Sequence, residues 1–232
     1  MVYRKKYMKK RKTKKGKKSL SKKLSKLSKF VYKTIEKKQV DFANIFLTFN
    51  NLAWRSQQLC KFDPIHISPG VPINPNGPHN AQRIGNSITL GPSIACALYI
   101  ESLDTNDNIR IIAVQWASKN SIVQPLTDPE LFLEDAGSNF QCLTSPYKIG
   151  STEKYKILYD KLINPKYAKT TLLHKFKVRG YNNLITYSPN SLPQVAAAPV
   201  QNSIVLYLFC SNSSAAVAPI ATLGHRMTFR DA

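Results

Sequence analysis

Residues 109–118, IRIIAVQWAS, decide the class of fold. The stretch is mostly apolar and rich in β-branched side chains, and it follows an Asp- and Asn-rich turn at residues 104–108. This pattern indicates a buried β-strand. A second stretch of the same kind, SIVLYLFC at residues 203–210, lies near the other end of the chain and is also expected to be a strand.

Outward from these two stretches, strand-like segments follow one another with long connections between them. We expect the other strands at residues 40–49, 82–101, 155–162, 172–179, 184–187 and 223–229, the second of them bent at Gly91-Pro92. The proline-rich residues 63–80 and the Ser/Ala-rich residues 211–222 are loops, and Asp128 caps a short surface helix over residues 128–137. Little helix and no βαβ alternation predict an all-β fold, and the chain length favours a single eight-stranded antiparallel jelly roll.

Charge is divided unequally along the chain. The 232 residues carry 34 Lys and Arg against 13 Asp and Glu, which gives a formal charge of +21. Residues 1–38 hold 18 of these cations and one acid, so they carry +17, whereas residues 39–232 carry only +4. The sequence therefore predicts two domains, a basic N-terminal arm at residues 1–38 and a nearly neutral jelly-roll body at residues 39–232.

The arm itself has two parts. Residues 1–18 carry +11 and almost nothing apolar, so we expect them to be disordered without a polyanion. In residues 19–38 apolar side chains recur every three or four positions between lysines, which predicts a basic amphipathic helix. Its apolar residues are Leu20, Leu24, Leu27, Val31 and Ile35. Three interpretations are open: the helix packs on the body or a neighbouring subunit, folds on nucleic acid, or lies on an anionic membrane; we favour the second.

Clustered lysines bind phosphate through charge and counterion release, without reading the base sequence. We therefore predict a nucleic-acid-binding site in the arm, formed by Arg4, Lys5, Lys6, Lys9, Lys10, Arg11, Lys12, Lys14, Lys15, Lys17, Lys18, Lys22 and Lys23. The densest part also matches the loose composition of a nuclear localisation signal, with Lys9, Lys10, Arg11, Lys12, Lys14, Lys15, Lys17 and Lys18.

The body contains no motif of a familiar catalytic site. It has no phosphate-binding glycine loop with its lysine, no HisGluxxHis and no GlyxSerxGly, and its four histidines are scattered along the chain. We expect no catalytic residues, no metal site and no cofactor, and thus no enzyme. The four cysteines, Cys60, Cys96, Cys142 and Cys210, fit neither a zinc spacing nor a compact disulfide framework, so we expect reduced thiols in or near the core. No apolar run is long enough for a transmembrane span, and we expect no stable membrane association.

Five stretches of the body, in this order after a polybasic arm, resemble the capsid proteins of small circular Rep-encoding single-stranded DNA viruses, circovirus-like in the broad sense. They are residues 36–41, 83–90, 110–116, 155–161 and 226–231. One departure from the family is that the arm is dominated by lysine and has only two arginines, Arg4 and Arg11. This departure argues against specific bidentate binding of phosphate and leaves the expected role of the positive charge unchanged.

The resemblance implies a viral coat protein that self-assembles into a small T=1 icosahedral shell, a homo-oligomer of about sixty copies. It also implies that the arm faces inward and packages a single-stranded DNA genome. The expected locations are the virion and, during assembly, the host nucleus, with the host nuclear import machinery as a partner. The alternatives are the coat protein of a small RNA virus or satellite, and a cellular nucleic-acid-binding protein with a basic tail.

Overall fold

The computed structural model describes residues 20, 22–27, 37–49, 54–61, 87–101, 103, 107–117, 128–136, 139–149, 154–164, 171–187, 199–212 and 218–231. The chain divides into two compact units, Met1–Glu36 and Lys37–Ala232. In the first unit, residues 20 and 22–27 are helical, as the amphipathic pattern predicts. The helix was predicted to continue to Lys38, and this boundary is wrong, because Lys38 is a buried residue of the first strand.

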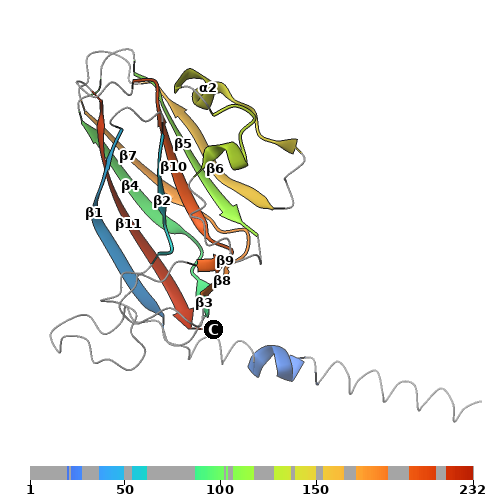
Figure 1. Cartoon of the computed structure of the whole chain (residues 1–232). Coiled ribbons are helices and arrows are strands. Elements are labelled where there is room, and N and C mark those ends of the chain that lie inside the picture. The colour runs from blue at the N-terminus through green and yellow to red at the C-terminus, as the bar shows by residue number, and fades with distance from the viewer. Residues whose placement is uncertain are drawn as a thin grey trace, which may run out of the picture. The chain divides into compact units, whose positions relative to one another are not determined.

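The second unit consists of two antiparallel sheets (Figure 1). The larger sheet contains β1 (Lys38–Thr48), β3 (Ser87–Leu90), β4 (Ile94–Glu101), β7 (Leu172–Val178), β8 (Leu184–Tyr187), β9 (Pro199–Gln201) and β11 (Ile220–Asp231). The smaller sheet contains β2 (Trp54–Gln58), β5 (Ile109–Trp116), β6 (Tyr155–Ile163) and β10 (Ile204–Cys210). Two short helices, η3 (Pro129–Leu131) and α2 (Asn139–Thr144), lie in the connection between β5 and β6.

The order of the strands is that of a jelly roll. In the larger sheet β11 pairs with β1 on one side and with β4 on the other, and β4 pairs with β7. In the smaller sheet the order is β2-β10-β5-β6. The first long strand therefore pairs with the last, and the second pairs with the next to last, which is the nested arrangement of two Greek keys. The predicted all-β jelly roll is confirmed.

Strands β3 and β4 together form one bent strand, as Gly91-Pro92 predicts. Both pair with β11, the first with residues 229–231 and the second with residues 220–226. At the bend, the amide of Gly91 donates a hydrogen bond of 2.6 Å to the carbonyl oxygen of Thr228. A Cβ atom at Gly91 would clash with the hydroxyl of Thr228 and would lie 3.0 Å from its carbonyl oxygen, so the close packing against Thr228 favours glycine here.

The core lies between the two sheets. On β4 every second residue, from Ile94 to Ile100, is buried, and the residues between them face outward. On β5 and β10, in contrast, every residue is buried. Residues 109, 111 and 113 of β5 and the even-numbered residues of β10 belong to the main core. Residues 112, 114 and 116 of β5 and the odd-numbered residues of β10 belong to a second apolar cluster on the other face of the sheet. The four cysteines are free and buried, as predicted.

Candidate functional site

The predicted nucleic-acid site of the arm falls mostly outside the described residues. Arg4 to Lys18 lie there, and with them all of the predicted nuclear localisation signal. Lys22 and Lys23 are described; both are exposed residues of the short helix. On the same helix Leu20, Leu24 and Leu27 are each at least 60% exposed. No helix among the described residues is long and apolar enough to cross a membrane.

The outer face of the smaller sheet is covered by a segment of its own chain. This outer segment comprises residues 128–136 and 139–149 and includes η3 and α2 (Figure 1). Its Phe132 is fully buried, with ring centroids 4.8 Å from Tyr207 and 6.2 Å from Trp116. The outer residues of β5 and β10 are therefore buried in an apolar and aromatic cluster, and no binding surface remains on them.

A buried arginine attaches the outer segment to the sheet. Nε and Nη2 of Arg110, on β5, donate hydrogen bonds of 3.0 and 2.8 Å to the two carboxylate oxygens of Asp160, on β6. Nη1 of Arg110 donates to three carbonyl oxygens at the end of α2, those of Cys142, Leu143 and Ser145, at 3.0–3.3 Å. A helix end leaves the carbonyls of Cys142 and Leu143 without intrahelical partners, and that of Ser145 lies just beyond the end, so the guanidinium completes their hydrogen bonding.

The protonation states in this network follow from burial and pairing. Burial alone would raise the pKa of Asp160, but the hydrogen bonds from Arg110 and Tyr147 outweigh it, so the pKa lies below its usual value of 3.8. Burial and the hydrogen bond to Asp160 raise the pKa of Tyr147. Asp160 is therefore ionised at neutral pH, and its carboxylate is paired with Arg110 and Tyr147 inside the fold. The network holds the outer segment on the sheet.

The outer face of the larger sheet is open, and strand register arranges it in rows. Phe46 lies opposite Thr222, which lies opposite Tyr99, which lies opposite Leu173. The row crosses β1, β11, β4 and β7, and its large side chains are exposed: Phe46 by 71%, Tyr99 by 38% and Leu173 by 58%. We call these three residues the apolar row.

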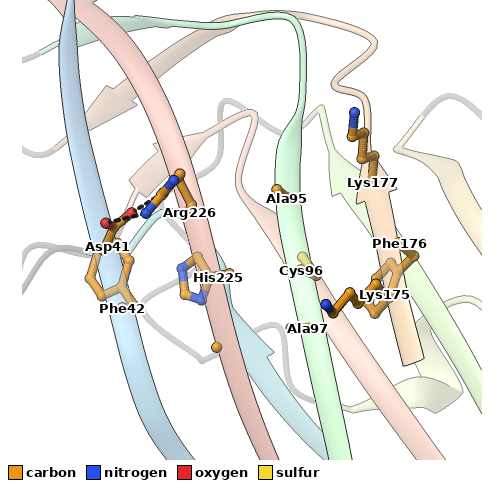
Figure 2. Close-up of a pocket in the computed structure, with 11 residues that line it drawn as sticks. Asp41, Phe42, Ala95, Cys96, Ala97, Lys175, Phe176, Lys177, His225 and Arg226 are labelled. Carbon is orange, nitrogen blue, oxygen red and sulfur yellow. Dashed lines mark hydrogen bonds and ion pairs between the residues drawn. The ribbon is translucent and has the colours of Figure 1, made fainter. Parts of the chain in front are cut away.

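Beside the apolar row the sheet is hollow, because its next outward residues are small. Gly224 lies opposite Ala97, and Arg226 lies opposite Ala95. Together with neighbouring residues of β1 and β7 they line a shallow hollow of about 530 Å³ (Figure 2). Lys175 and Lys177, on β7, border this hollow, and both are exposed. The ion pairs among the described residues do not include either of them.

On the opposite side of the hollow an exposed ion pair joins β1 to β11. Nε and Nη2 of Arg226 donate to the carboxylate of Asp41 at 2.6 and 2.9 Å (Figure 2). The hydrogen bond and the charge of Arg226 lower the pKa of Asp41. The two charges balance each other, so Lys175 and Lys177 give this part of the face its positive charge.

Beneath the open face lies a buried histidine. His225 is 4% exposed, its ring stacks on Phe42 at 4.4 Å, and Nε2 lies 2.9 Å from the carbonyl oxygen of Leu59. Since a carbonyl oxygen only accepts, Nε2 carries the proton and donates it. Burial lowers the pKa of His225 from 6.5 to about 4, so the ring is neutral at pH 7.

Sequence patterns did not single out the open face. The signal that could have found part of it is the alternation in β7, LLHKFKV, which places Leu173, Lys175 and Lys177 on one side of the strand. Phe46 joins them only through the pairing of β1 with β11 and of β11 with β4. Among the described residues, no group of three His, Cys, Asp or Glu side chains could hold a metal ion.

No protein-family model matches the chain, and no curated protein matches it significantly in sequence. Several solved structures align with most of the chain. A chain of an empty virus-like particle of Cowpea Mosaic Virus aligns with 80% of this chain and 79% of its own length, at 11% identity and a TM-score of 0.37. The BFDV capsid protein in its 60-mer aligns with 85% and 95%, at 9% identity and a TM-score of 0.30. A chain of Israeli acute paralysis virus aligns with 84% and 71%, at 9% identity and a TM-score of 0.27.

Proposed function

We propose that this chain is a viral coat protein that assembles into a small closed shell and packages nucleic acid with its N-terminal arm. The observation that carries the proposal is the division of charge: +17 in residues 1–38 and +4 in residues 39–232, the latter folded as a jelly roll. A cellular protein that coats nucleic acid with its folded domain would carry cations on that domain as well. In this chain they are concentrated in the arm.

The specific form that we propose is a circovirus-like capsid protein. About sixty copies form a T=1 shell, the arms face inward, and the cargo is single-stranded DNA. The protein serves as a structural component of the virion and not as an enzyme. The lysine-rich part of the arm also directs newly made subunits to the host nucleus through the nuclear import machinery. The resemblance of five sequence stretches to that family supports this form.

Charge matching gives the proposal a scale. Sixty arms at +17 carry about 1,000 positive charges, and a single strand carries one phosphate charge per nucleotide. The arms alone therefore neutralise roughly a thousand nucleotides, and small cations balance the rest of a longer genome. Since lysine ammonium groups recognise phosphate and not sugar, the same arms would bind RNA, which makes an RNA virus or satellite the alternative.

The test replaces eight cations of the arm with Gln: Lys9, Lys10, Arg11, Lys12, Lys14, Lys15, Lys17 and Lys18. Affinity for single-stranded DNA should fall, and the slope of log affinity against log salt should flatten by up to about 5.6, at about 0.7 for each of the eight lost phosphate contacts. A control that changes the seven lysines among them to Arg keeps the charge and should keep the slope. An unchanged affinity and slope in the Gln variant would assign the binding to the body and would contradict the role of the arm.

A further inference from the structure

The open face of the larger sheet combines two features. One is the apolar row, in which Phe46 and Tyr99 offer exposed aromatic rings. The other is the pair of exposed lysines on β7, one and two alternation steps along the same side of the strand from Leu173. Successive outward positions on a strand are about 7 Å apart and neighbouring strands about 4.8 Å apart, so Tyr99 lies within one nucleotide's reach of Lys175. Phe46 lies three strands from β7, roughly 14 Å across the sheet, so a strand of several nucleotides is needed to reach both it and the lysines.

The floor of the hollow beside these features is formed by residues with a small side chain or none. Ala95, Ala97 and Gly224 leave the backbone of β4 and β11 accessible, and the hollow of about 530 Å³ is within the range of sites that hold small organic groups. Figure 2 shows Lys175 and Lys177 along one side of this floor and the Asp41–Arg226 ion pair along the other. A flat ring can lie on such a floor with an anionic group beside the lysines.

We propose that this face is a second nucleic-acid site, on which a single strand stacks bases against Phe46 and Tyr99 and places its phosphates beside Lys175 and Lys177. The inference rests on the proposed function, because it takes the packaged strand as its ligand. Aromatic rings next to cations on a sheet surface are the means by which proteins bind unpaired nucleic acid without sequence preference. A purely apolar protein partner would gain nothing from burying two lysines.

Charge on the face also determines on which side of the hollow the phosphates of the bound nucleic acid lie. Glu101 lies on the far side of the apolar row from the lysines, opposite Ile220. Arg226 is neutralised by Asp41. The phosphates are therefore attracted to the β7 side of the hollow and repelled from the Glu101 end. The basic arm, in contrast, is repelled by Lys175 and Lys177, so its own segments are a poor fit for this surface.

The test uses the full chain and a short oligothymidylate as the probe. Because arm binding is electrostatic, it weakens steeply with salt, whereas stacking does not, so affinities are measured from low to high salt. Phe46→Ala with Tyr99→Ala should lower the affinity at high salt by at least about fivefold for each ring. Lys175→Gln with Lys177→Gln should flatten the salt slope by about 1.4.

A matched control for the lysine variant removes two lysines from the other sheet. Lys156→Gln with Lys161→Gln on β6 changes the net charge equally and should leave both the salt slope and the high-salt affinity unchanged. All of these side chains are exposed, so the thermal melt of the variants should match that of the parent. Unchanged affinity in the Phe46/Tyr99 variant at every salt concentration would overturn the inference.

Two further outcomes separate this inference from the role of the arm. If the eight-Gln arm variant loses all binding while the face variants bind as the parent does, the face site is wrong and the arm stands. If the arm variant binds normally and the face variants do not, the arm is wrong and the face stands. Displacement of the oligothymidylate at high salt, where arm binding is weak, by an equally charged polyglutamate peptide at equal affinity would show that the face recognises charge alone, and would contradict stacking.

Discussion

The two outer faces of the sandwich differ although both belong to antiparallel sheets. The outer face of the smaller sheet is buried beneath residues 128–136 and 139–149, whereas the outer face of the larger sheet is open across β1, β11, β4 and β7. The amino-acid sequences of the strands reflect this difference between the two sheets. Strands β5 and β10 are apolar at nearly every position because both of their faces are covered, and β4 and β7 alternate because one face meets solvent. An uninterrupted apolar run thus marks the sheet that an extra segment covers.

The comparison implies that residues of the same type contribute very differently on the two faces. An aromatic ring or an arginine below the outer segment has lost its contact with water and has gained packing or hydrogen bonds. Its counterpart on the open face remains solvated, so its removal leaves the folded state almost as stable.

The largest effect is expected for the aromatic side chains. Phe132→Ala should lower the free energy of unfolding by about 3–5 kcal/mol, because the ring is fully buried and a cavity remains. Phe46→Ala, on the open face, should change it by less than about 0.5 kcal/mol. Urea denaturation of both variants checks the pair. Equal losses would show that the outer segment does not pack on the sheet.

The arginines form the second pair. Arg110→Met should destabilise the body by about 3 kcal/mol, because it leaves Asp160 without its partner and three carbonyl groups of the α2 end without a donor. Arg226→Met removes an ion pair whose side chains are 60% and 49% exposed, and the denaturation midpoint should stay at the parent value. Should Arg226→Met be the more destabilising change, the assignment of buried and open faces would be reversed.

The third prediction concerns pH and the histidine below the open face. The folded state keeps His225 neutral with a pKa of about 4, whereas the unfolded chain protonates it near 6.5. The unfolded state therefore binds more protons between these values, and stability is lost as the pH falls from 6.5 to 4, by up to about 1.4 kcal/mol per pH unit. Urea midpoints measured at several pH values reveal this slope.

His225→Gln is the control for that slope. Its amide keeps a donor for the carbonyl oxygen of Leu59 and has no proton to gain, so the loss of stability between pH 6.5 and 4 should be smaller than in the parent. The same slope in both proteins would mean that other groups, such as carboxylates, cause the acid sensitivity.

The smallest effect is expected at the N-terminus. Deletion of residues 1–36 should leave the cooperative melt of the body within about 0.5 kcal/mol of the full chain, since we predict that the arm is independent of the core. Deletion of residues 1–38 should cost more, because it removes the buried Lys38 and its pairing with Phe229. Circular dichroism melts of the two truncations check both statements. Loss of the melt on the shorter deletion would make the amphipathic helix part of the core.

Most of the fold could be predicted because the long strands carry their own signal. Apolar runs marked β5 and β10, and the Gly91-Pro92 bend marked the break between β3 and β4. Strand β2, with the sequence WRSQQ, was not predicted, because it lacks apolar alternation and is held by its pairing with β10. The three-residue β9 begins with Pro199, a residue that argues against a strand. Helix α2 is held at its end by Arg110, a tertiary contact that no local pattern shows.

The two candidate nucleic-acid sites also differ in whether the sequence could predict them. The arm could be predicted from composition alone, because its charge is concentrated in one continuous segment. The open face could not, because its residues come from four strands and meet only through register. Phe46 follows an irregularity between Phe42 and Ile45 that shifts the alternation of β1 by one residue. A strictly alternating strand would have placed Phe46 inward, so the local backbone decides which side this ring faces.

The most direct test of the proposed function is electron microscopy of particles formed by the full chain, with their contents typed by nuclease digestion. We expect uniform closed shells of about sixty subunits whose nucleic acid is degraded by a DNA-specific nuclease once the shells are opened. Contents degraded only by ribonuclease would replace DNA with RNA as the cargo. Soluble protein that binds nucleic acid but forms no closed particle under any condition would contradict the assignment as a coat protein.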